Sequence, residues 1–275
     1  MATPFVPIVK PIDYLVPSAP TILATASANL IHVAFINNST VSDKEVNTVL
    51  VALQQQVSFQ FSRAWGITAQ LHFYPKSITN SIPSGYWQIE LLNNTDGSGA
   101  LGYHMPPFYP GAPGILPNPT NTLPKTVPCA RVFTTTSNTA LGSGNWSTVA
   151  SHELLEMLAD PNGSHASWIS PILPTSPPTA ITVQALILRE VCDPVESIAQ
   201  AYKIGTVLVS DFVTPAWYDY FSLVPSIPKR AAPVFNIRGN LKTPLTIVPD
   251  GSATIYYGAI STGQVVWPGP GNLVL

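Results

Sequence analysis

Charge is the scarcest property of this sequence. Asp, Glu, Lys and Arg make up only 9% of its 275 residues, whereas they make up about a quarter of an ordinary soluble domain. The formal net charge is −2, so no basic excess exists to attract nucleic acid, and we predict no nucleic-acid partner. Long apolar runs are also missing, which predicts that the chain has no transmembrane segment.

Cysteine is almost absent as well. Cys129 and Cys192 are the only two, and they could form one disulfide or remain two buried thiols. The first twenty residues lack the basic segment and apolar core of a secretory signal, which makes thiols the default. Nevertheless, a surface poor in charge and rich in Pro, Ser, Thr and Asn favours an extracellular or cell-surface location, or burial in an assembly, so the localisation stays open.

Three regions differ in composition. Residues 1–27 form a Pro-rich, aperiodic arm, residues 28–225 carry the periodic apolar segments of the main domain, and residues 226–275 have the short β-branched runs of a β-rich tail or small subdomain. A long helix is predicted from Ser42 to Trp65, because Ser42 and Glu45 form a capping box and Gly66 suits a helix end. Strands are predicted at 29–37, 67–74, 86–92, 100–104, 130–135 and 185–191, with a Ser/Gly/Asn loop after residue 135.

The segment 151–161 carries the strongest chemical signal. His152 and Glu156 stand four residues apart, so on a helix they share one face and could bind one cation. Glu153 occupies the place of the general base in the His-Glu-x-x-His motif of zinc peptidases. The apolar residues between these side chains predict a buried helix, and the segment contains no Lys or Arg to neutralise its acids.

One His and one Glu do not complete a catalytic zinc site, which needs a third protein ligand. Glu190 and Asp193 are the best candidates, because they lie at a predicted strand end just before Pro194. Asp160 lies about 12 Å along the helix from His152, too far to share the ion, so we expect it to support the ligands or to act at the helix end. His104 is a further candidate, because an imidazole would make the ligand set more suited to zinc.

The run His152-Glu153-x-x-Glu156, followed by Asp160-Pro161, Trp168 and Glu190-x-x-Asp193, resembles zincin-like metallopeptidases with a His-Glu-x-x-Glu helix. It is similar, more loosely, to exordium-like secreted proteins, although here Cys192 precedes Asp193 instead of following the acid. The resemblance covers residues 31–220. It implies an α+β fold in which a mixed sheet packs on two main helices, with the β-rich C-terminal extension outside it.

The same resemblance implies a substrate cleft between the central helix and an edge strand, which is either 86–92 or 100–104. It further implies that His152, Glu156 and one of Glu190 or Asp193 bind the ion, with Glu153 as the general base. Tyr103 or His104 would donate a hydrogen bond to the developing oxyanion. The expected ion is Zn²⁺, while a shell of one imidazole and two carboxylates leaves Ca²⁺ or Mn²⁺ as further candidates.

Two functions from different classes follow. The first is a zinc-dependent hydrolase, specifically a peptidase, acting on a peptide or protein substrate. The second is a non-catalytic extracellular or assembly-forming protein in which a cation stabilises the fold, with homo-oligomer contacts through the Pro-rich arm and the β-rich tail. A carbohydrate-binding module, suggested only by the tryptophans, is less favoured because core packing accounts for large aromatics more often.

Overall fold

The structure is a computed structural model that describes residues 30–76, 82–107, 127–169, 172–173, 181–182, 185–218, 233–257, 264–268 and 271–272. The predicted Pro-rich arm, residues 1–27, lies outside the described residues. In the part of the chain that is described, no helix has the length and apolar character to cross a bilayer, in agreement with the predicted absence of a transmembrane segment.

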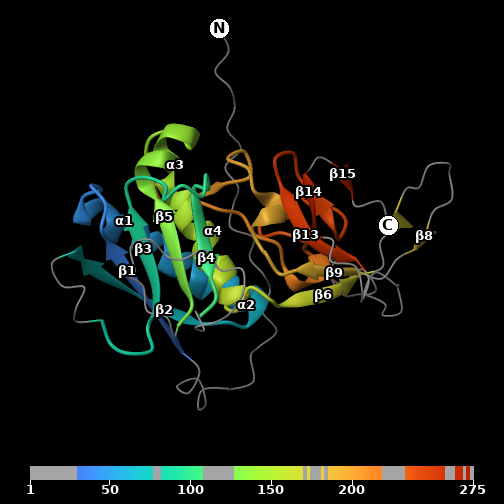
Figure 1. The fold of residues 1–275 in the computed structure, drawn as a ribbon, viewed down its shortest axis with the longest axis horizontal. Helices are drawn as coiled ribbons and strands as arrows, with labels where there is room; N and C mark the ends of the chain where they lie inside the picture. The colour runs from blue at the N-terminus through green and yellow to red at the C-terminus, as the bar shows by residue number, and fades with distance from the viewer. Residues whose placement is uncertain are drawn as a thin grey trace, which may run out of the picture. The chain divides into compact units, whose positions relative to one another are not determined.

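A five-stranded mixed sheet organises the N-terminal half of the described chain (Figure 1). Its strands are β1 (Ile31–Asn37), β2 (Ala69–Pro75), β3 (Trp87–Leu92), β4 (Gly102–Met105) and β5 (Cys129–Phe133), in the order β2-β1-β3-β5-β4. The neighbours among β2, β1, β3 and β5 pair in parallel, and β4 pairs antiparallel with β5. Of the two candidate edge strands, the one near residues 100–104 is therefore the edge, and β3 is central.

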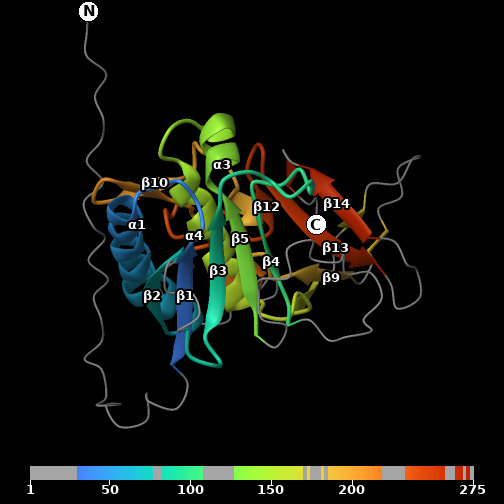
Figure 2. The ribbon, with the colours of Figure 1, turned by 60° about the vertical axis from the view of Figure 1, so that its left-hand side comes forward.

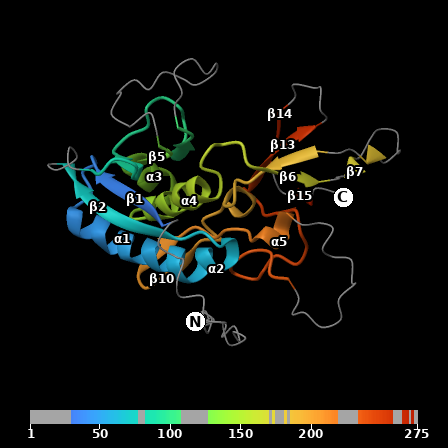
Figure 3. The same ribbon diagram turned by 90° about the horizontal axis from the view of Figure 1, so that it is seen from below.

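The predicted long helix is present as one continuous run (Figure 3). It comprises α1 (Asp43–Gln56), a π-helical turn (Val57–Phe61) and α2 (Ser62–Trp65). Ser42 Oγ accepts the Glu45 N–H at 3.2 Å, and Gly66 ends the run in the left-handed conformation at φ 71°. Both ends of this helix are confirmed, because both are fixed by local residues.

The central helix α4 (Trp146–Ala159) is confirmed, and a second helix precedes it. Residues predicted as a loop after 135 instead form α3 (Thr134–Leu141), and the loop prediction was wrong. Thr, Ser and Asn are weak helix formers in isolation, but Thr135 donates its N–H to Asn93 O at 2.8 Å and Thr134 Oγ1 donates to Leu92 O at 3.0 Å. These contacts with the end of β3 hold the first turn of α3 in place.

The core lies between one face of the sheet and the helices. Strand register places Val33, Leu71, Ile89 and Ala130 on this face, where they join one buried cluster with residues of α1 and α4. Trp146 and Trp217 are completely buried in the same cluster, so these two tryptophans serve packing rather than surface recognition. The two cysteines are free and buried, as their default assignment predicted.

A second sheet has the strand order β14-β13-β9-β6 and lies beyond the β4 edge of the first in Figures 1 and 2. Its members are β6 (Ala166–Ile169), β9 (Ala185–Leu188), β13 (Ser252–Tyr257) and β14 (Gln264–Pro268). Because β13 pairs with β9, the C-terminal residues join strands that follow α4. The remaining elements are β7 (Ile172–Leu173), β8 (Ile181–Thr182), a 3₁₀ helix (Asp193–Val195), β10 (Tyr202–Ile204), β11 (Val207–Val209), α5 (Pro215–Tyr218), β12 (Thr246–Ile247) and β15 (Gly271–Asn272).

A buried acid outside the cleft makes stability depend on pH. Burial raises the pKa of Asp211 from 3.8 to about 6, although hydrogen bonds from Asn236 Nδ2 (2.6 Å) and Phe212 N–H (2.9 Å) favour its charged form. Between these two values the folded protein binds more protons at this site than the unfolded chain does. Its contribution to the free energy of unfolding therefore falls as pH rises through this window, by on the order of 2–3 kcal/mol.

Urea unfolding of the wild type and of Asp211→Asn at pH 4 and pH 7 tests this expectation. The variant should lose less stability than the wild type on going from pH 4 to pH 7, because Asn does not titrate. Because the other acids are the same in both proteins, their contribution to the pH dependence cancels when the two proteins are compared. An identical pH dependence in both proteins would contradict a raised pKa at Asp211.

Candidate metal centre

Helix α4 presents the first two donor side chains to one point. His152 Nε2 lies 3.0 Å from Glu156 Oε2, as expected for residues one turn apart. Ser151, next to His152 on α4, belongs to a buried polar cluster that fixes this turn of the helix. Ser151 Oγ donates to Gln56 Oε1 at 2.7 Å and accepts the Ser210 N–H at 3.1 Å, so α4 is held at the correct rotation.

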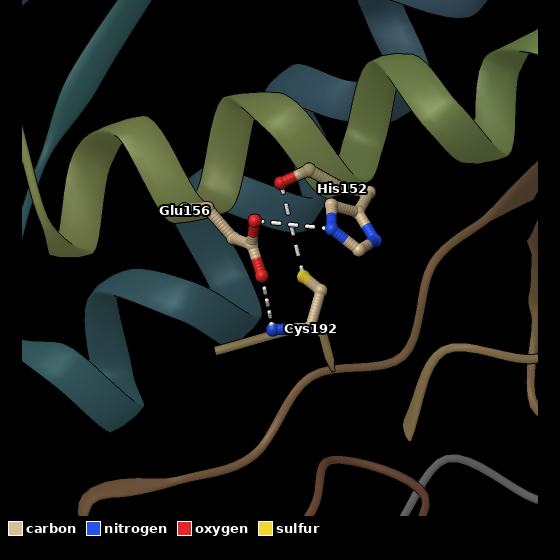
Figure 4. Close-up of side chains that lie close together, drawn as sticks. All are labelled: His152, Glu156 and Cys192. Carbon is tan, nitrogen blue, oxygen red and sulfur yellow. Dashed lines mark hydrogen bonds and ion pairs between the residues drawn. The ribbon is translucent and has the colours of Figure 1, made fainter. Parts of the chain in front are cut away.

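The loop after β9 brings a third donor to the same point. The N–H groups of Cys192 and Asp193 donate to Glu156 Oε1 at 3.0 and 3.2 Å, which leaves Oε2 directed towards His152 (Figure 4). Asp193 Oδ1 lies 3.4 Å from His152 Nε2. Between the two predicted alternatives, Asp193 is therefore the acid adjacent to the His152–Glu156 pair.

The edge strand supplies the opposite wall. Register places Gly102 and His104 of β4 on the sheet face that carries Ala130 and Val132, which is the face towards α4. His104 Nδ1 lies 3.7 Å from Glu153 Oε2 and 3.7 Å from Glu156 Oε2, while its Nε2 lies 3.6 Å from Glu190 Oε2. Thus His104 is surrounded by three carboxylates.

Two predicted residues do not join the donor cluster, although Tyr103 borders the cleft. Because side chains alternate along a strand, Tyr103 points to the other face of the sheet, where its hydroxyl donates to Asp96 and accepts from Arg131. The structure does not bring that hydroxyl to the cluster. Asp160 lies at the end of α4, and its carboxylate accepts the N–H groups of Ser164 and His165, both at 2.9 Å.

Crowded acids dominate the electrostatics of the cluster. Burial acts to lower the pKa of His104, but the nearby carboxylates of Glu153, Glu190 and Glu156 outweigh it and raise the pKa to about 9. Burial also acts against the charged form of His152, and the charge of Glu156 together with Asp193 nevertheless raises its pKa well above 6.5. Without a cation, both imidazoles are therefore expected to be protonated.

The pKa values of two acids in the cluster are raised as well. Burial, reinforced by the charge of Glu156, raises the pKa of Glu190 to about 9 and also raises the pKa of Asp193. Burial raises the pKa of the Cys192 thiol well above its usual value, and this thiol donates to His152 O at 3.8 Å. Protons or a metal ion must therefore balance the negative charge of this cluster.

The residues fit a divalent ion. Among the described residues, two groups of donors lie within 4.8 Å of one another: His152, Glu156 and Cys192, and His104, Glu156 and Glu190. Imidazole and carboxylate are the usual ligands of zinc and manganese. In addition, Glu190 Oε2 is buried and has no hydrogen-bond partner among the described residues, which is costly unless a cation approaches it.

The cluster lines a cleft of about 740 Å³. Of the 14 acidic residues in the chain, six border this cleft, and none of its described lining residues is Lys or Arg. Sequence patterns did not indicate two acids of the cleft, Glu196 and Asp250, or the thiol of Cys192 in the first donor group. Cys192 was recognisable from its position beside Asp193, whereas Asp250 reaches the cleft only because the C-terminal strands pair with β9. The six acids are Glu153, Glu156, Glu190, Asp193, Glu196 and Asp250.

Gly102 sets the distance between the edge strand and α4. A Cβ atom at this position would lie 2.7 Å from Val149 Cγ1, 2.9 Å from Glu153 Cγ and 2.9 Å from Arg131 O. We therefore expect Gly102→Ala to push β4 away from α4 and to lower the free energy of unfolding by about 1–3 kcal/mol, the usual cost of overpacking.

The double variant Gly102→Ala/Val149→Ala provides the control, because it removes the closest clashing atom. Urea unfolding of the wild type, both single variants and the double variant should show that the two changes together cost less than their sum, by at least about 0.5 kcal/mol. Strict additivity would contradict the close approach of β4 to α4.

Comparison of the chain with protein-family models, curated proteins and solved structures found no match. The resemblance to zincin-like metallopeptidases therefore remains a prediction. What the structure itself defines is a mixed α/β protein whose edge strand, central helix and following loop surround an acid-rich cleft.

Proposed function

We propose that this protein is a metal-dependent hydrolase that cleaves peptide bonds in the cleft between β4 and α4. The observation that supports this proposal most is that side chains from distant parts of the sequence meet at one place in the cleft. Donor atoms from three separate segments, β4, α4 and the loop after β9, approach one another at 3.0 to 3.7 Å in a cleft lined by six acids.

In this proposal His152 and Glu156 hold the ion, with Zn²⁺ first and Mn²⁺ or Ca²⁺ as alternatives. Asp193 is in neither donor group, but its Oδ1 lies 3.4 Å from His152 Nε2, and in the proposal its carboxylate turns to the ion as the third ligand. A divalent ion bound there would supply a Lewis acid and a site for activating water. The N–H groups of Cys192 and Asp193 fix Glu156 through its Oε1, so that its other oxygen is available to the ion. Such outer hydrogen bonds orient ligands and tune their basicity.

Glu153 is the proposed general base. It is buried on α4 at 6% exposure, borders the cleft, and is not one of the proposed ligands. Its carboxylate is therefore available to take a proton from the attacking water and to return it to the leaving amine.

Peptide cleavage is tested directly with the purified protein. After saturation with Zn²⁺, Mn²⁺ or Ca²⁺, it is incubated with a random peptide library, and new termini are identified by mass spectrometry. We expect cleavage that chelation abolishes and that the ion restores. No cleavage with any of the three ions would reject the peptidase proposal.

The substrate class follows from the charge of the cleft. Glu196 and Asp250 are exposed at its border, and Ile198 beside them is 44% exposed and also borders the cleft. An aliphatic stem ending in a cation fits an apolar surface flanked by acids. We therefore propose that the peptide substrate carries Lys or Arg near the cleaved bond.

Cleavage of matched peptides that differ only in Lys, Ala or Glu at each position checks this preference. We expect the Lys peptide to be favoured over the Glu peptide by about tenfold in kcat/KM at low salt, and Glu196→Gln/Asp250→Asn to reduce the ratio by about fivefold. Asp43→Asn, which removes a charge from the first turn of α1, serves as the control. Equal cleavage of all three peptides would contradict the proposed substrate class.

A further inference from the structure

We propose that the cleft holds two divalent cations that share Glu156, the second one bound by His104 and Glu190. The inference deepens the proposed function, on which it rests only in treating this cleft as the metal centre. The cleft would bind a pair of transition-metal ions, Zn²⁺ or Mn²⁺, because each half of the site offers one imidazole and at least one carboxylate.

The donors separate into two groups. Among the described residues, one group contains His152, Glu156 and Cys192, the other contains His104, Glu156 and Glu190, and no group contains both imidazoles. Two ligands of a single ion, each bound at about 2.1 Å, can be at most about 4.2 Å apart. The two imidazoles therefore belong to neighbouring positions, and Glu156 is the residue that both positions share.

The spacing around His104 fits an ion better than a hydrogen bond. Its Nδ1 lies 3.7 Å from Glu156 Oε2 and its Nε2 lies 3.6 Å from Glu190 Oε2, beyond the usual hydrogen-bond range of about 2.7–3.2 Å. An ion takes only one of these two nitrogens, and one of them lies within 4.8 Å of oxygens of both carboxylates. Two ligands on one tetrahedral ion lie about 3.4 Å apart. The His104 side chain is only 9% exposed, and Glu190 Oε2 beside it is buried without a hydrogen-bond partner in the described chain.

The charge of the cluster also accommodates a second divalent ion, in place of the protons that would otherwise balance it. Glu153, Glu156, Glu190 and Asp193 carry four negative charges when ionised, and the imidazoles are neutral when they bind a metal. One divalent ion leaves two of these charges uncompensated in a partly buried cleft, which is unfavourable. Two divalent ions balance all four. A carboxylate shared between two ions about 3.5–4 Å apart is the usual arrangement of two-metal hydrolases.

Metal counting tests the proposal without any activity measurement. The full chain is saturated with Zn²⁺, passed through a desalting column and analysed by mass spectrometry. We expect two ions per chain in the wild type, and one in each of His104→Ala, Glu190→Gln and His152→Ala. The matched control Glu45→Gln, on α1 outside the cleft, should keep two. One ion in the saturated wild type, or two ions retained in His104→Ala, would overturn the proposal.

Electron paramagnetic resonance of the Mn²⁺-loaded wild type tests it without relying on a variant. Two Mn²⁺ ions bridged by Glu156 should show exchange coupling, whereas the spectrum of isolated Mn²⁺ at saturation would overturn the shared site. The outcomes separate the two proposals. Two coupled ions without peptide cleavage would leave this inference standing and remove the peptidase, and cleavage with one ion would do the reverse.

Discussion

Replacing Glu153 with Gln is expected to lower kcat for peptide cleavage by about 10²–10⁴-fold, the range that general acid–base catalysis contributes. Gln has nearly the shape of Glu but cannot accept the proton. Glu153 is not in either donor group, so the bound metal should be unchanged. Steady-state kinetics on a single cleaved peptide, with metal content measured on the same sample, gives both numbers.

Glu45→Gln is the matched control for this variant. Glu45 Oε1 accepts the Trp146 Nε1–H at 2.9 Å, and the amide oxygen of Gln can accept the same hydrogen bond. The control should therefore keep both its fold and its kcat. If Glu153→Gln retains wild-type kcat with a full complement of metal, Glu153 is not the base.

Removing the bound ions is expected to lower the melting temperature by about 10 °C. An ion present at about a thousand times its dissociation constant stabilises the folded state by roughly 4 kcal/mol. For a chain of this size each kcal/mol shifts the melting temperature by about 2–4 °C. The acids left without a cation around Glu156 oppose folding as well.

Differential scanning calorimetry of loaded and chelated protein measures this shift, and Glu156→Gln should abolish most of it. An unchanged melting temperature after complete chelation would contradict an ion in the cluster. The non-catalytic alternative, in which the cation only stabilises the fold, predicts the same shift in melting temperature. It also predicts that neither the wild type nor Glu153→Gln cleaves peptides.

Local residues made the helices predictable where the ends were marked. The Ser42–Glu45 capping box and Gly66 delimit α1 to α2, and on α4 the four-residue spacing of His152 and Glu156 places them on one face. By contrast, α3 has no such signal. It forms because Asn93 and Leu92 accept its first hydrogen bonds, a contact between segments about forty residues apart that no local pattern contains.

The cluster was predictable only in part for the same reason. The spacing of residues could nominate His104 and Tyr103 together, but only the pairing of β4 with β5 decides that His104 faces α4 and Tyr103 does not. Likewise, choosing between Glu190 and Asp193 requires the position of the loop after β9. Glu156 fixes that loop by accepting two of its N–H groups.

The central claim is that the carboxylates of this cleft are held together by cations. The most direct measurement is an anomalous difference map from crystals of the Zn²⁺-loaded protein, with data collected on both sides of the zinc absorption edge. We predict one peak beside His152 Nε2, Glu156 Oε2 and Asp193 Oδ1, and a second peak between His104, Glu156 and Glu190. A map without any zinc peak within bonding distance of Glu156 would contradict the account.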